Sequence, residues 1–373
     1  MKVGCVKEIK NNEYRVGLTP DGARDFIAHG HEVYLEKGAG LGSGFPDEDY
    51  QALGVTIFDR AEEVWSKVEM MVKVKEPLEE EYPFLREGLI LFTYFHLAAA
   101  PVLLDTILES KLKAVAYETI EEADGSLPCL APMSQIAGRL SIQEGAKYLE
   151  KPFGGAGILL AGVPGTPKAN VVILGAGAVG ANACKIALGM GANVSILNRS
   201  VKKLEHLDNI FGAHVQTLVS SESNIERVLE DADLVIGSVL IPGGSTPKLI
   251  QRHHLKAMKD GAVFVDVSID QGGCAESSRP TTHDDPIYIE EGVIHYCVTN
   301  MPGAVPRTST IALTNATLPF ALRIADNGLE EAVQKDHALA RGVNCYLGKV
   351  TNENLAQASG KKYHTLDEAV LSK

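Results

Sequence analysis

Residues 171–198 read VVILGAGAVGANACKIALGMGANVSILN, and this stretch decides the fold. The apolar run Val171–Leu174 is typical of a buried parallel strand and ends on a G-x-G-x-x-G pattern. The glycines of this pattern are Gly175, Gly177 and Gly180. A segment compatible with a helix follows to about Met190, and a second apolar run begins at Val194. This order of strand, turn, helix and strand is the context that a dinucleotide-binding motif requires.

Each glycine has its own physical role in such a unit. Gly175 allows the tight turn, Gly177 lets the backbone approach a pyrophosphate, and Gly180 lets the helix pack close to the strand. The amino end of the helix then offers N–H groups and a positive dipole to the phosphates. A purely structural glycine turn is the alternative, and the flanking elements favour the dinucleotide site. Asn198 closes the second strand, where an acidic side chain usually binds the ribose.

Length and composition indicate a globular protein of about two domains. The chain has 373 residues, and a domain has roughly 150. Hydrophobic residues make up 45%, and the formal net charge of -13 argues against nucleic acid as a main partner. We expect no membrane span, because no run reaches ~18 apolar residues, and we see no apolar signal segment. The six cysteines lack metal-type spacing, so we expect reduced thiols in a cytoplasmic protein.

The first third of the chain alternates strands and helices, which predicts a parallel sheet covered on both faces. The expected strands are Val3–Val6, Glu32–Leu35, Met70–Val74, Leu89–Tyr94 and Ala114–Glu118. The expected helices begin at Thr19-Pro20, at Asp47 and at Pro101. A second unit repeats the alternation with six strands that begin near Val171, Val194, His214, Leu234, Ala262 and Val293. Past Asn300 the pattern changes to helices over Thr308–Asp326 and Glu330–Gly342.

These C-terminal helices cannot complete a second sheet that already has six strands, so we infer that they return to the first domain. The predicted substrate domain is 1–129 plus 307–373, and the NAD(P)-binding Rossmann domain is the insertion 130–306. A long amphipathic stretch, Pro132–Glu150, leads towards the glycine loop. The predicted fold class is α/β, with two Rossmann-like doubly wound parallel-sheet domains joined by long helices.

Ligands of open parallel sheets bind beyond the carboxyl ends of the strands, so polar residues there are candidates. Those residues are Arg15, Lys75, His96, Asp270, Asn300 and Met301. A guanidinium can bind a carboxylate with two hydrogen bonds, a lysine can bind the same anion or polarise a carbonyl, and a histidine can move protons. Taken alone, the two cations also fit a surface role, His96 a hydrogen-bonded core residue and Asp270 a loop cap. Their common location favours a site.

Several motifs together resemble those of the alanine dehydrogenase/pyridine nucleotide transhydrogenase family. They are Lys7-Glu8-Ile9-Lys10, Glu13-Tyr14-Arg15-Val16, Val72–Pro77, Leu91–Ala98, Leu130–Ser134, the glycine loop, Asp270–Cys274 and Asn300–Pro302. The resemblance covers nearly the whole chain. It implies two Rossmann-like domains, a long connecting helix and a homohexamer.

The resemblance also implies roles for individual residues. Arg15 and Lys75 are expected on the substrate carboxylate, with Tyr94, Asn300 and Met301 near the substrate, and His96 and Asp270 handle protons. The expected cofactor residues are Ser134, Gly175, Gly177, Ala178, Val179, Gly180, Asn198, Arg199, Lys203, Ser220, Val239, Leu240, Val267, Ser268, Ile269, Asp270, Arg279, Val298, Asn300 and Met301. The implied reaction is the reversible oxidative deamination of L-alanine to pyruvate and ammonia, with hydride transfer to NAD.

Two positions depart from the family pattern. Asn198, followed by Arg199, replaces the acidic residue that selects NAD, so NADP is expected to be accepted as well. Some members bind a divalent ion through a glutamate matching Glu118 and a histidine at the position of Asn327. With asparagine at that position we do not expect a metal.

Two other functions remain open at this stage. One is a transhydrogenase-like nucleotide-binding subunit, which needs a membrane partner and no substrate pocket. The other is a nucleotide-sensing protein without turnover. The presence of Arg15, Lys75 and His96, and the lack of a membrane segment, favour the dehydrogenase.

Overall fold

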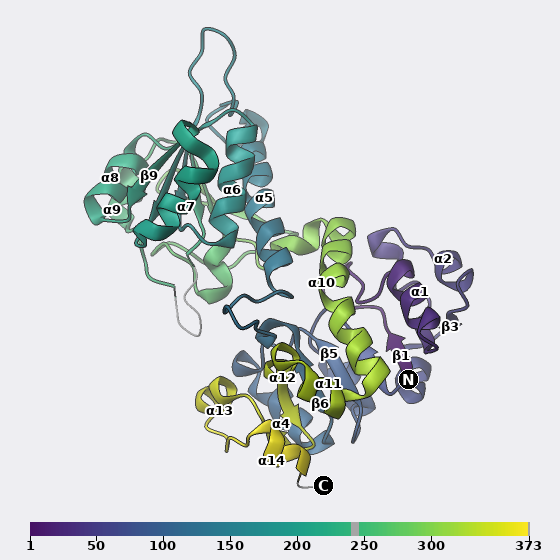
Figure 1. Ribbon diagram of the computed structural model, residues 1–373. Helices are drawn as coiled ribbons and strands as arrows, with labels where there is room; N and C mark the ends of the chain where they lie inside the picture. Colours follow the sequence, from purple (N-terminus) through teal and green to yellow (C-terminus); the bar gives the residue numbers. More distant parts are fainter. Residues whose placement is uncertain (240–245, 372–373) are drawn as a thin grey trace. The chain divides into compact units, whose positions relative to one another are not determined.

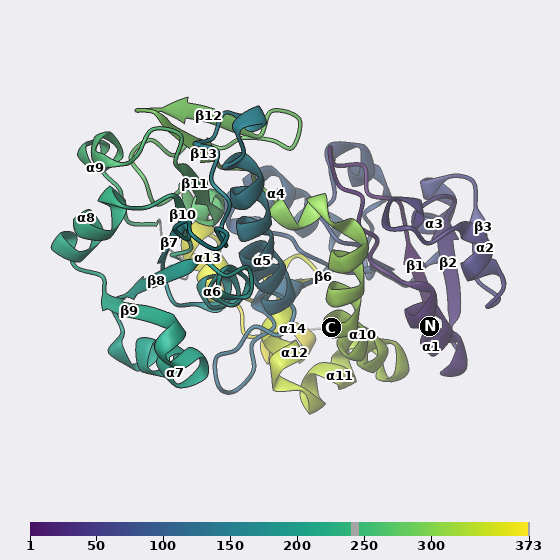
Figure 2. The same cartoon turned by 90° about the horizontal axis from the view of Figure 1, so that it is seen from above.

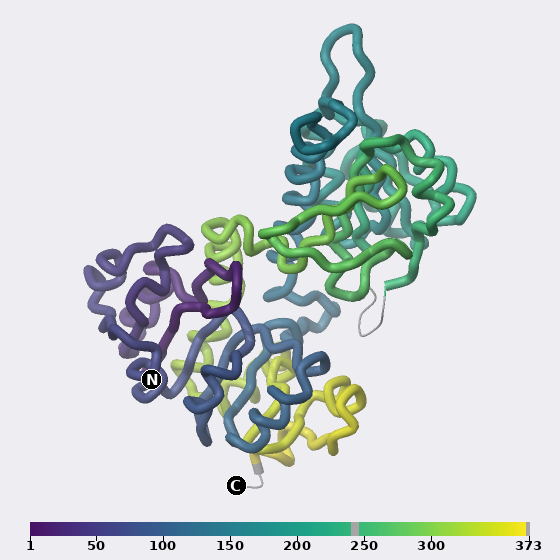
Figure 3. The backbone as a smooth tube through the Cα atoms, turned by 180° about the vertical axis from the view of Figure 1, so that it is seen from behind, coloured from purple at the N-terminus to yellow at the C-terminus, as the bar shows by residue number. Residues whose placement is uncertain are grey.

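The computed structural model describes residues 1–239 and 246–371 of the chain (Figure 1). These residues form two units, of which the first comprises Met1–Met133 and Val305–Lys373 and the second comprises Ser134–Ala304. The second unit is therefore an insertion into the first. In Figure 3 the yellow C-terminal segment lies beside blue strand segments of the first unit.

The first unit contains one eight-stranded sheet. Its strands are β1 (Lys2–Cys5), β2 (Glu32–Glu36), β3 (Thr56–Phe58), β4 (Met70–Val72), β5 (Ile90–Thr93), β6 (Lys113–Ala116), β14 (Val343–Tyr346) and β15 (Lys349–Val350). Its α-helices are α1 (Pro20–Ala28), α2 (Asp47–Gln51), α3 (Ala61–Lys67), α4 (Pro101–Ser110), α10 (Pro306–Asn327), α11 (Leu329–Lys335), α12 (His337–Gly342), α13 (Glu353–Ser359) and α14 (Leu366–Leu371). Short 3-10 helices include η2 (Glu79–Phe84), η3 (Leu97–Ala99) and η4 (Tyr117–Thr119).

The strand order of this sheet is β15-β14-β6-β5-β4-β1-β2-β3. Strands β1 to β6 pair in parallel, whereas β14 and β15 join the edge antiparallel. From β1 the chain builds outward through β2 and β3, and then returns to place β4, β5 and β6 on the other side. The order thus reverses between β1 and β4, which is the topological switch point of a doubly wound sheet.

The second unit contains a seven-stranded sheet (Figure 2). Its strands are β7 (Asn170–Leu174), β8 (Asn193–Asn198), β9 (Val215–Val219), β10 (Leu234–Gly237), β11 (Val263–Asp266), β12 (Ile287–Glu290) and β13 (Val293–Tyr296). Its helices are α5 (Ala131–Tyr148), which begins at the end of the first unit, α6 (Ala178–Gly189), α7 (Val201–Phe211), α8 (Glu222–Glu230) and α9 (Arg252–Ala257). The short helices η7 (Val267–Gln271) and η8 (Met301–Ala304) carry candidate residues.

The order of the second sheet is β12-β13-β11-β10-β7-β8-β9, and all neighbours are parallel except β12 and β13. Its switch point lies between β7 and β10. The sequence pattern predicted six strands here and missed β12, which pairs antiparallel with β13 as a short edge hairpin. Antiparallel edge strands are common on parallel sheets, and of the four residues of β12 only Tyr288 is buried, so this strand lacks the buried apolar run of the parallel strands.

The predicted fold class is confirmed, since both sheets are parallel-dominated and flanked by helices. The strands form because their side chains are apolar on both faces, as parallel sheets require. Central residues of β4, β5 and β6, such as Met71, Leu91 and Ala114, are 0% exposed. The start of α1 is as expected, because Thr19 Oγ1 accepts the N–H of Gly22 at 3.2 Å and Pro20 fills the first turn.

The C-terminal segment differs from the sequence prediction. The expected helix over Glu330–Gly342 is two helices, because Asp336 has extended backbone and caps α12 by accepting the N–H groups of Ala338 and Leu339, both at 3.0 Å. Strands β14 and β15 were not predicted either. The short runs Val343–Tyr346 and Lys349–Val350 carry little pattern of their own and become strands because β6 offers an open edge.

Within residues 1–239 and 246–371, no helix combines the length and apolarity that a membrane span needs.

The cap of α12 gives a test of the C-terminal fold. Replacing Asp336→Ala removes two capping hydrogen bonds and an ion pair with Arg323, and should destabilise the protein by about 1–2 kcal/mol, measured by chemical or thermal unfolding. Glu331→Ala is the matched control, because its exposed pair with Lys335 should contribute little. Equal effects of the two substitutions would contradict the capping role.

Candidate functional site

The two switch points place the candidate residues at the carboxyl edges of the sheets. In the first sheet Arg15 lies on the loop after β1, Lys75 follows β4, and His96 follows β5. Since β1, β4 and β5 are neighbours, the topology brings these loops to one edge. In the second sheet the glycine turn follows β7, and Asp270 lies on η7, directly after β11. Each unit therefore contains one candidate region.

Arg15 forms a buried bidentate ion pair with Glu13. The guanidinium Nε and Nη2 donate to Oε1 and Oε2 of Glu13 at 2.7 and 2.6 Å, and the backbone N–H of Arg15 donates to Oε1 at 3.1 Å. Only 2% of Arg15 and 5% of Glu13 are exposed. Desolvation raises the pKa of Glu13, but the hydrogen bonds and charge of Arg15 outweigh it and lower the pKa to about 2. Glu13 therefore stays ionised and fixes the orientation of Arg15.

A buried charge cluster lies behind the end of β4. Lys73 is 0% exposed, and its Nζ contacts Oε1 of Glu81 at 2.8 Å and Oε2 of Glu8 at 3.2 Å. The other oxygen of Glu8 accepts the N–H groups of Val74 and Lys75 at 2.6 and 3.3 Å. Burial alone would lower the pKa of Lys73, yet the two carboxylates raise it. Burial also raises the pKa of Glu8, against the attraction of the Lys73 charge. Through its hydrogen bonds to Val74 and Lys75, Glu8 holds the backbone that carries Lys75.

Lys75 is the second cation at this edge. Its Nζ makes no hydrogen bond or ion pair within residues 1–239 and 246–371. Desolvation, and then repulsion by the charge of Arg15, lower its pKa. Two cations that repel each other in a partly buried place are stabilised by an anion, and a carboxylate fits a guanidinium and an ammonium together.

Tyr94 and His96 complete this region. Their rings stack, with centroids 6.0 Å apart and planes inclined by 5°. Tyr94 is buried and donates its hydroxyl hydrogen to the carbonyl of Cys129 at 2.6 Å. His96 is exposed and has a left-handed backbone with φ 51°. Glu118 supports this strained backbone, because Oε1 accepts the N–H of His96 at 2.7 Å and lies 4.0 Å from Nδ1.

The glycine turn of the second unit has the close packing expected of a dinucleotide site. Gly175 has φ 112°, and a side chain there would meet the carbonyl oxygen of Ser238 at 2.6 Å. A Cβ at position 180 would lie 1.9 Å from the carbonyl oxygen of Gly175, so α6 can pack here only with glycine. A Cβ at Gly177 would meet nothing within 4 Å. The backbone at the amino end of α6 is thus open to a ligand.

Asn198 ends β8 beside this turn. Its Oδ1 accepts the N–H of Ala176 at 3.3 Å, and its Nδ2 donates to the carbonyl of Ser200 at 3.3 Å. The backbone carbonyl of Asn198 also accepts the N–H of Ser220, which places that candidate on the neighbouring strand end. Arg199 and Lys203 are exposed on the loop and on α7. This corner is therefore polar and positively charged.

A buried carboxylate also holds the loop of Asp270. Asp266 is 0% exposed and accepts the N–H groups of Ser268 and Cys274 at 3.0 and 2.9 Å and the hydroxyl of Ser278 at 2.6 Å. The loop so formed exposes Asp270 on η7. The hydroxyl of Ser268 donates to the carbonyl of Val239 at 2.8 Å, which joins the ends of β10 and β11.

The other predicted residues lie in the second unit as well. Asn300 has φ 58° and precedes Met301, which is 3% exposed, at the start of η8. Arg279 stacks over the ring of Tyr288 at 3.8 Å, so its guanidinium already has a partner. Ser134 lies on α5, and Val298 follows β13. Ala178 and Val179 are the first two residues of α6, and Val267 and Ile269 lie on η7. Leu240 lies outside the described residues.

Sequence reasoning did not single out the supporting carboxylates. Glu8 and Glu13 stood inside quoted motifs, and Asp266 lay within a predicted strand, but none carried an obvious chemical role. An acidic residue inside an apolar run, or in a short loop between two strands, is the sequence signal that could have found them.

A hollow of about 750 Å³ lies at the amino ends of β7, β8 and β9 and is lined by residues such as Asn170, Asn193 and His214. It contains none of the candidate residues.

Comparison with known proteins now identifies the family. Residues 4–137 match the N-terminal domain of the family described as alanine dehydrogenase/PNT, and residues 141–353 match its C-terminal domain. The chain belongs to the alanine dehydrogenase/PNT family. The resemblance drawn from the motifs is therefore confirmed.

Relatives from bacteria and archaea match along the whole chain. A Staphylococcus haemolyticus protein named alanine dehydrogenase is 53% identical over 371 residues, which cover 99% of each chain. A Methanococcus maripaludis protein of the same name is 54% identical over 371 residues, covering 99% of this chain and 100% of the relative. A solved structure named L-alanine dehydrogenase is 47% identical, with a TM-score of 0.94 over 96% of this chain and 99% of that one. A Sinorhizobium meliloti transhydrogenase structure, 21% identical with a TM-score of 0.82 over 95% and 99% of the two chains, shares the fold.

The buried charge cluster gives a stability test. Replacing Lys73→Met leaves Glu8 and Glu81 buried without their cation and should destabilise the protein by about 3–5 kcal/mol in chemical unfolding. Lys37→Met is the control, because Lys37 pairs with Asp59 at the surface and its loss should hardly move the unfolding midpoint. A small effect of Lys73→Met would mean that the two carboxylates do not depend on it.

Proposed function

We propose that the protein is an L-alanine dehydrogenase that converts L-alanine and water to pyruvate and ammonia, and catalyses the reverse reaction, with a nicotinamide cofactor. The observation that carries the proposal is the joint placement of Arg15 and Lys75 at the switch point of the first sheet, next to His96. The family and the relatives named alanine dehydrogenase support it. Our proposal also includes a cytoplasmic homohexamer, as the family resemblance implies.

The second unit fits a dinucleotide. Gly177 leaves the amino end of α6 open, and the packing at Gly175 and Gly180 forms the tight turn that cradles a pyrophosphate. We assign the binding of its phosphates to this turn and the adenosine ribose to the corner of Asn198 and Ser220. When bound, the nicotinamide accepts a hydride from the alanine Cα or returns one in the reverse direction. We assign NAD as the main cofactor, with NADP also accepted.

The first unit is the proposed substrate unit. Arg15, held by Glu13, and Lys75, held through its backbone by Glu8, bind the carboxylate that alanine and pyruvate share. This contact fixes the orientation of Cα, and Lys75 can also polarise the carbonyl of pyruvate. Tyr94 packs behind His96 and fixes the plane of its ring. Asn300 and Met301 are the remaining candidates for substrate contact.

His96 and Asp270 are the proposed proton-handling residues. In deamination the ammonium group of alanine must lose a proton, and loss of the hydride then gives iminopyruvate. Water adds to the imine carbon, and the imidazole of His96 accepts its proton. That proton passes to the nitrogen, and the imidazole accepts the proton of the new hydroxyl group as the carbon–nitrogen bond breaks, which yields pyruvate and ammonia. We assign Asp270, exposed on η7, to the proton exchange with the amine nitrogen.

A spectrophotometric assay tests this function directly. Purified protein mixed with L-alanine and NAD should form reduced cofactor, and pyruvate, ammonia and NADH should consume it. A panel of small amino acids and of glyoxylate defines the substrate range. Nucleotide binding without alanine-dependent reduction would instead indicate a sensor or a transhydrogenase-like subunit.

The assignment of the proton-handling residues predicts a loss of turnover. A positioned acid or base contributes roughly a hundred- to ten-thousand-fold to rate, so His96→Ala and Asp270→Ala should each reduce kcat by that order. The affinity for NADH, measured by fluorescence, should remain nearly unchanged. Turnover within a few-fold of the parent in both variants would refute the assignment.

The carboxylate site predicts a pH-dependent affinity for pyruvate. Lys75→Met should weaken pyruvate binding about tenfold or more, since a charge-assisted contact contributes roughly 1.5–3 kcal/mol. The pKa of Lys75 is lowered. The parent protein should therefore bind pyruvate tightly at pH values well below that pKa, where Lys75 is charged, and its affinity should fall as the pH rises through the pKa. The variant should lack this loss. An identical pH profile in the two proteins would exclude Lys75 from the site.

The corner of Asn198 predicts the cofactor preference. Asparagine can bond a ribose hydroxyl but carries no charge to repel a 2′-phosphate, and Arg199 adds a cation that suits one. Asn198→Asp should therefore depress kcat/KM for NADP more than for NAD. The ratio of the two efficiencies is the measurement, and a ratio that does not change would leave Asn198 without a selective role.

A further inference from the structure

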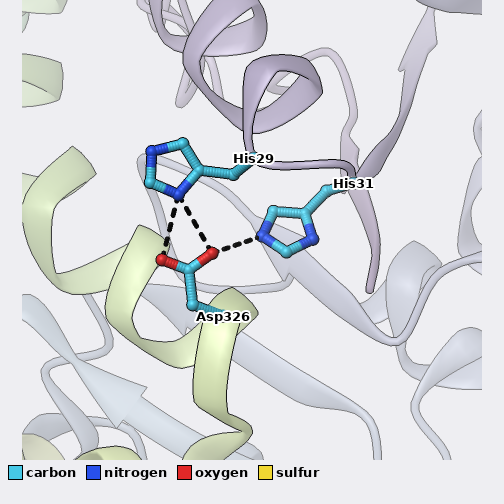
Figure 4. Close-up of side chains that lie close together, drawn as sticks. All are labelled: His29, His31 and Asp326. Atoms are coloured by element: carbon cyan, nitrogen blue, oxygen red, sulfur yellow. Dashed lines mark hydrogen bonds and ion pairs between the residues drawn. The ribbon is translucent and has the colours of Figure 1, made fainter.

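Two histidines and an aspartate that have no role in the proposed function meet in the first unit. His29 and His31 lie on the loop after α1, and Asp326 lies at the end of α10 (Figure 4). Nδ1 of His29 lies 3.1 and 3.0 Å from the two oxygens of Asp326, and Nε2 of His31 lies 2.9 Å from Oδ1. A carboxylate only accepts, so both ring nitrogens direct a proton towards it in this arrangement.

We propose that His29, His31 and Asp326 form a binding site for Zn²⁺. One ligand atom from each residue lies within 4.8 Å of the other two. Tetrahedral zinc with bonds of about 2.0–2.1 Å separates its ligand atoms by roughly 3.3 Å, close to the nitrogen–oxygen distances found here. Among residues 1–239 and 246–371, this is the one group of three or more such side chains with this spacing.

The electrostatic potential of two helix ends favours a cation beside these three side chains. His29 is the C-cap of α1, and Asp326 is the last residue but one of α10, so the negative ends of two helix dipoles converge. Arg323, three residues before Asp326 in the sequence, pairs with Asp336. Zinc would replace the two protons now directed at the carboxylate.

The exposure of the three side chains fits three protein ligands and a water. His31 is fixed, with a side chain only 7% exposed, and the Met1 amino group lies 3.2 Å from its other ring nitrogen as a hydrogen-bond partner. The side chains of His29 and Asp326 are 47% and 36% exposed, which leaves room for a water on the solvent side. Two imidazoles with one carboxylate suit zinc, whereas Mg²⁺ prefers oxygen ligands alone.

The proposed site differs from the metal site that some family members have and that we did not expect in this sequence. That site would use Glu118 and the residue at position 327. Here Glu118 accepts the backbone N–H groups of Phe95 and His96, and the Asn327 amide donates to the carbonyl of Arg323. The new site instead joins two segments nearly 300 residues apart in sequence, as the separation of 297 between His29 and Asp326 shows. Bound zinc should therefore stabilise the first unit, without any need for substrate or nucleotide.

The test is to measure zinc binding to the whole protein. The protein is produced without a histidine tag and is freed of metal with a chelator. Calorimetric titration with ZnCl₂ near pH 7.5 should show one equivalent bound, and Tm should rise by roughly 5 °C at saturation. MgCl₂ should produce neither effect. The six cysteines should not compete for zinc, because all of them are buried.

The variants separate this site from general surface binding. His29→Gln, on an exposed side chain, and Asp326→Asn, which keeps the shape of the residue, should each weaken zinc binding roughly tenfold or more. His253→Gln is the matched control, because it removes an exposed histidine of the second unit. The proposal is wrong if zinc does not bind, if both site variants bind as the parent does, or if the control loses as much affinity as they do.

Discussion

Carboxylates that accept backbone N–H groups hold the ends of the strands, and the candidate site depends on them. Glu8 accepts the N–H groups of Val74 and Lys75, and Glu118 accepts that of His96. Glu13 accepts the N–H of Arg15 as well as its guanidinium, and Asp266 holds the loop that carries Asp270. Arg15, Lys75, His96 and Asp270 thus each follow a strand whose end is held by a nearby acid.

This arrangement has a physical reason. At the carboxyl end of a parallel strand the ladder stops, and N–H groups of the following loop lose their partners in a buried place. Water could satisfy them only at the cost of an open structure. An ionised carboxylate satisfies two of them at once and forms the stronger, charge-assisted type of hydrogen bond. A nearby cation balances the charge of the carboxylate: Lys73 pairs with Glu8, and Arg15 pairs with Glu13.

The glycine turn shows how much of this could be predicted. Gly175, Gly177 and Gly180 act through the backbone alone, so their spacing between two apolar runs was sufficient to predict the turn and the parallel sheet. Arg15, Lys75 and His96 could be proposed because they follow predicted strands. The parallel strand order then explains why Arg15 and Lys75 share one environment.

Other features depend on contacts between distant segments and leave little trace in a local pattern. Strand β14 exists because β6 has an open edge, and β12 exists because a tight turn folds it onto β13. The role of Lys73 also needed the structure, since a lysine in an apolar run is unremarkable until Glu8 and Glu81 are found on either side. The meeting of His29, His31 and Asp326 is of the same kind.

The central claim is that buried acids position the substrate-binding cations of the first unit, while the second unit binds the nucleotide. Glu13→Gln tests it most directly, because it keeps the shape of the side chain and removes the charge that orients Arg15. The KM for pyruvate should rise about tenfold or more, whereas the dissociation constant for NADH should stay within a factor of about two. An unchanged KM for pyruvate, or a loss of NADH affinity as large as the loss for pyruvate, would contradict the account.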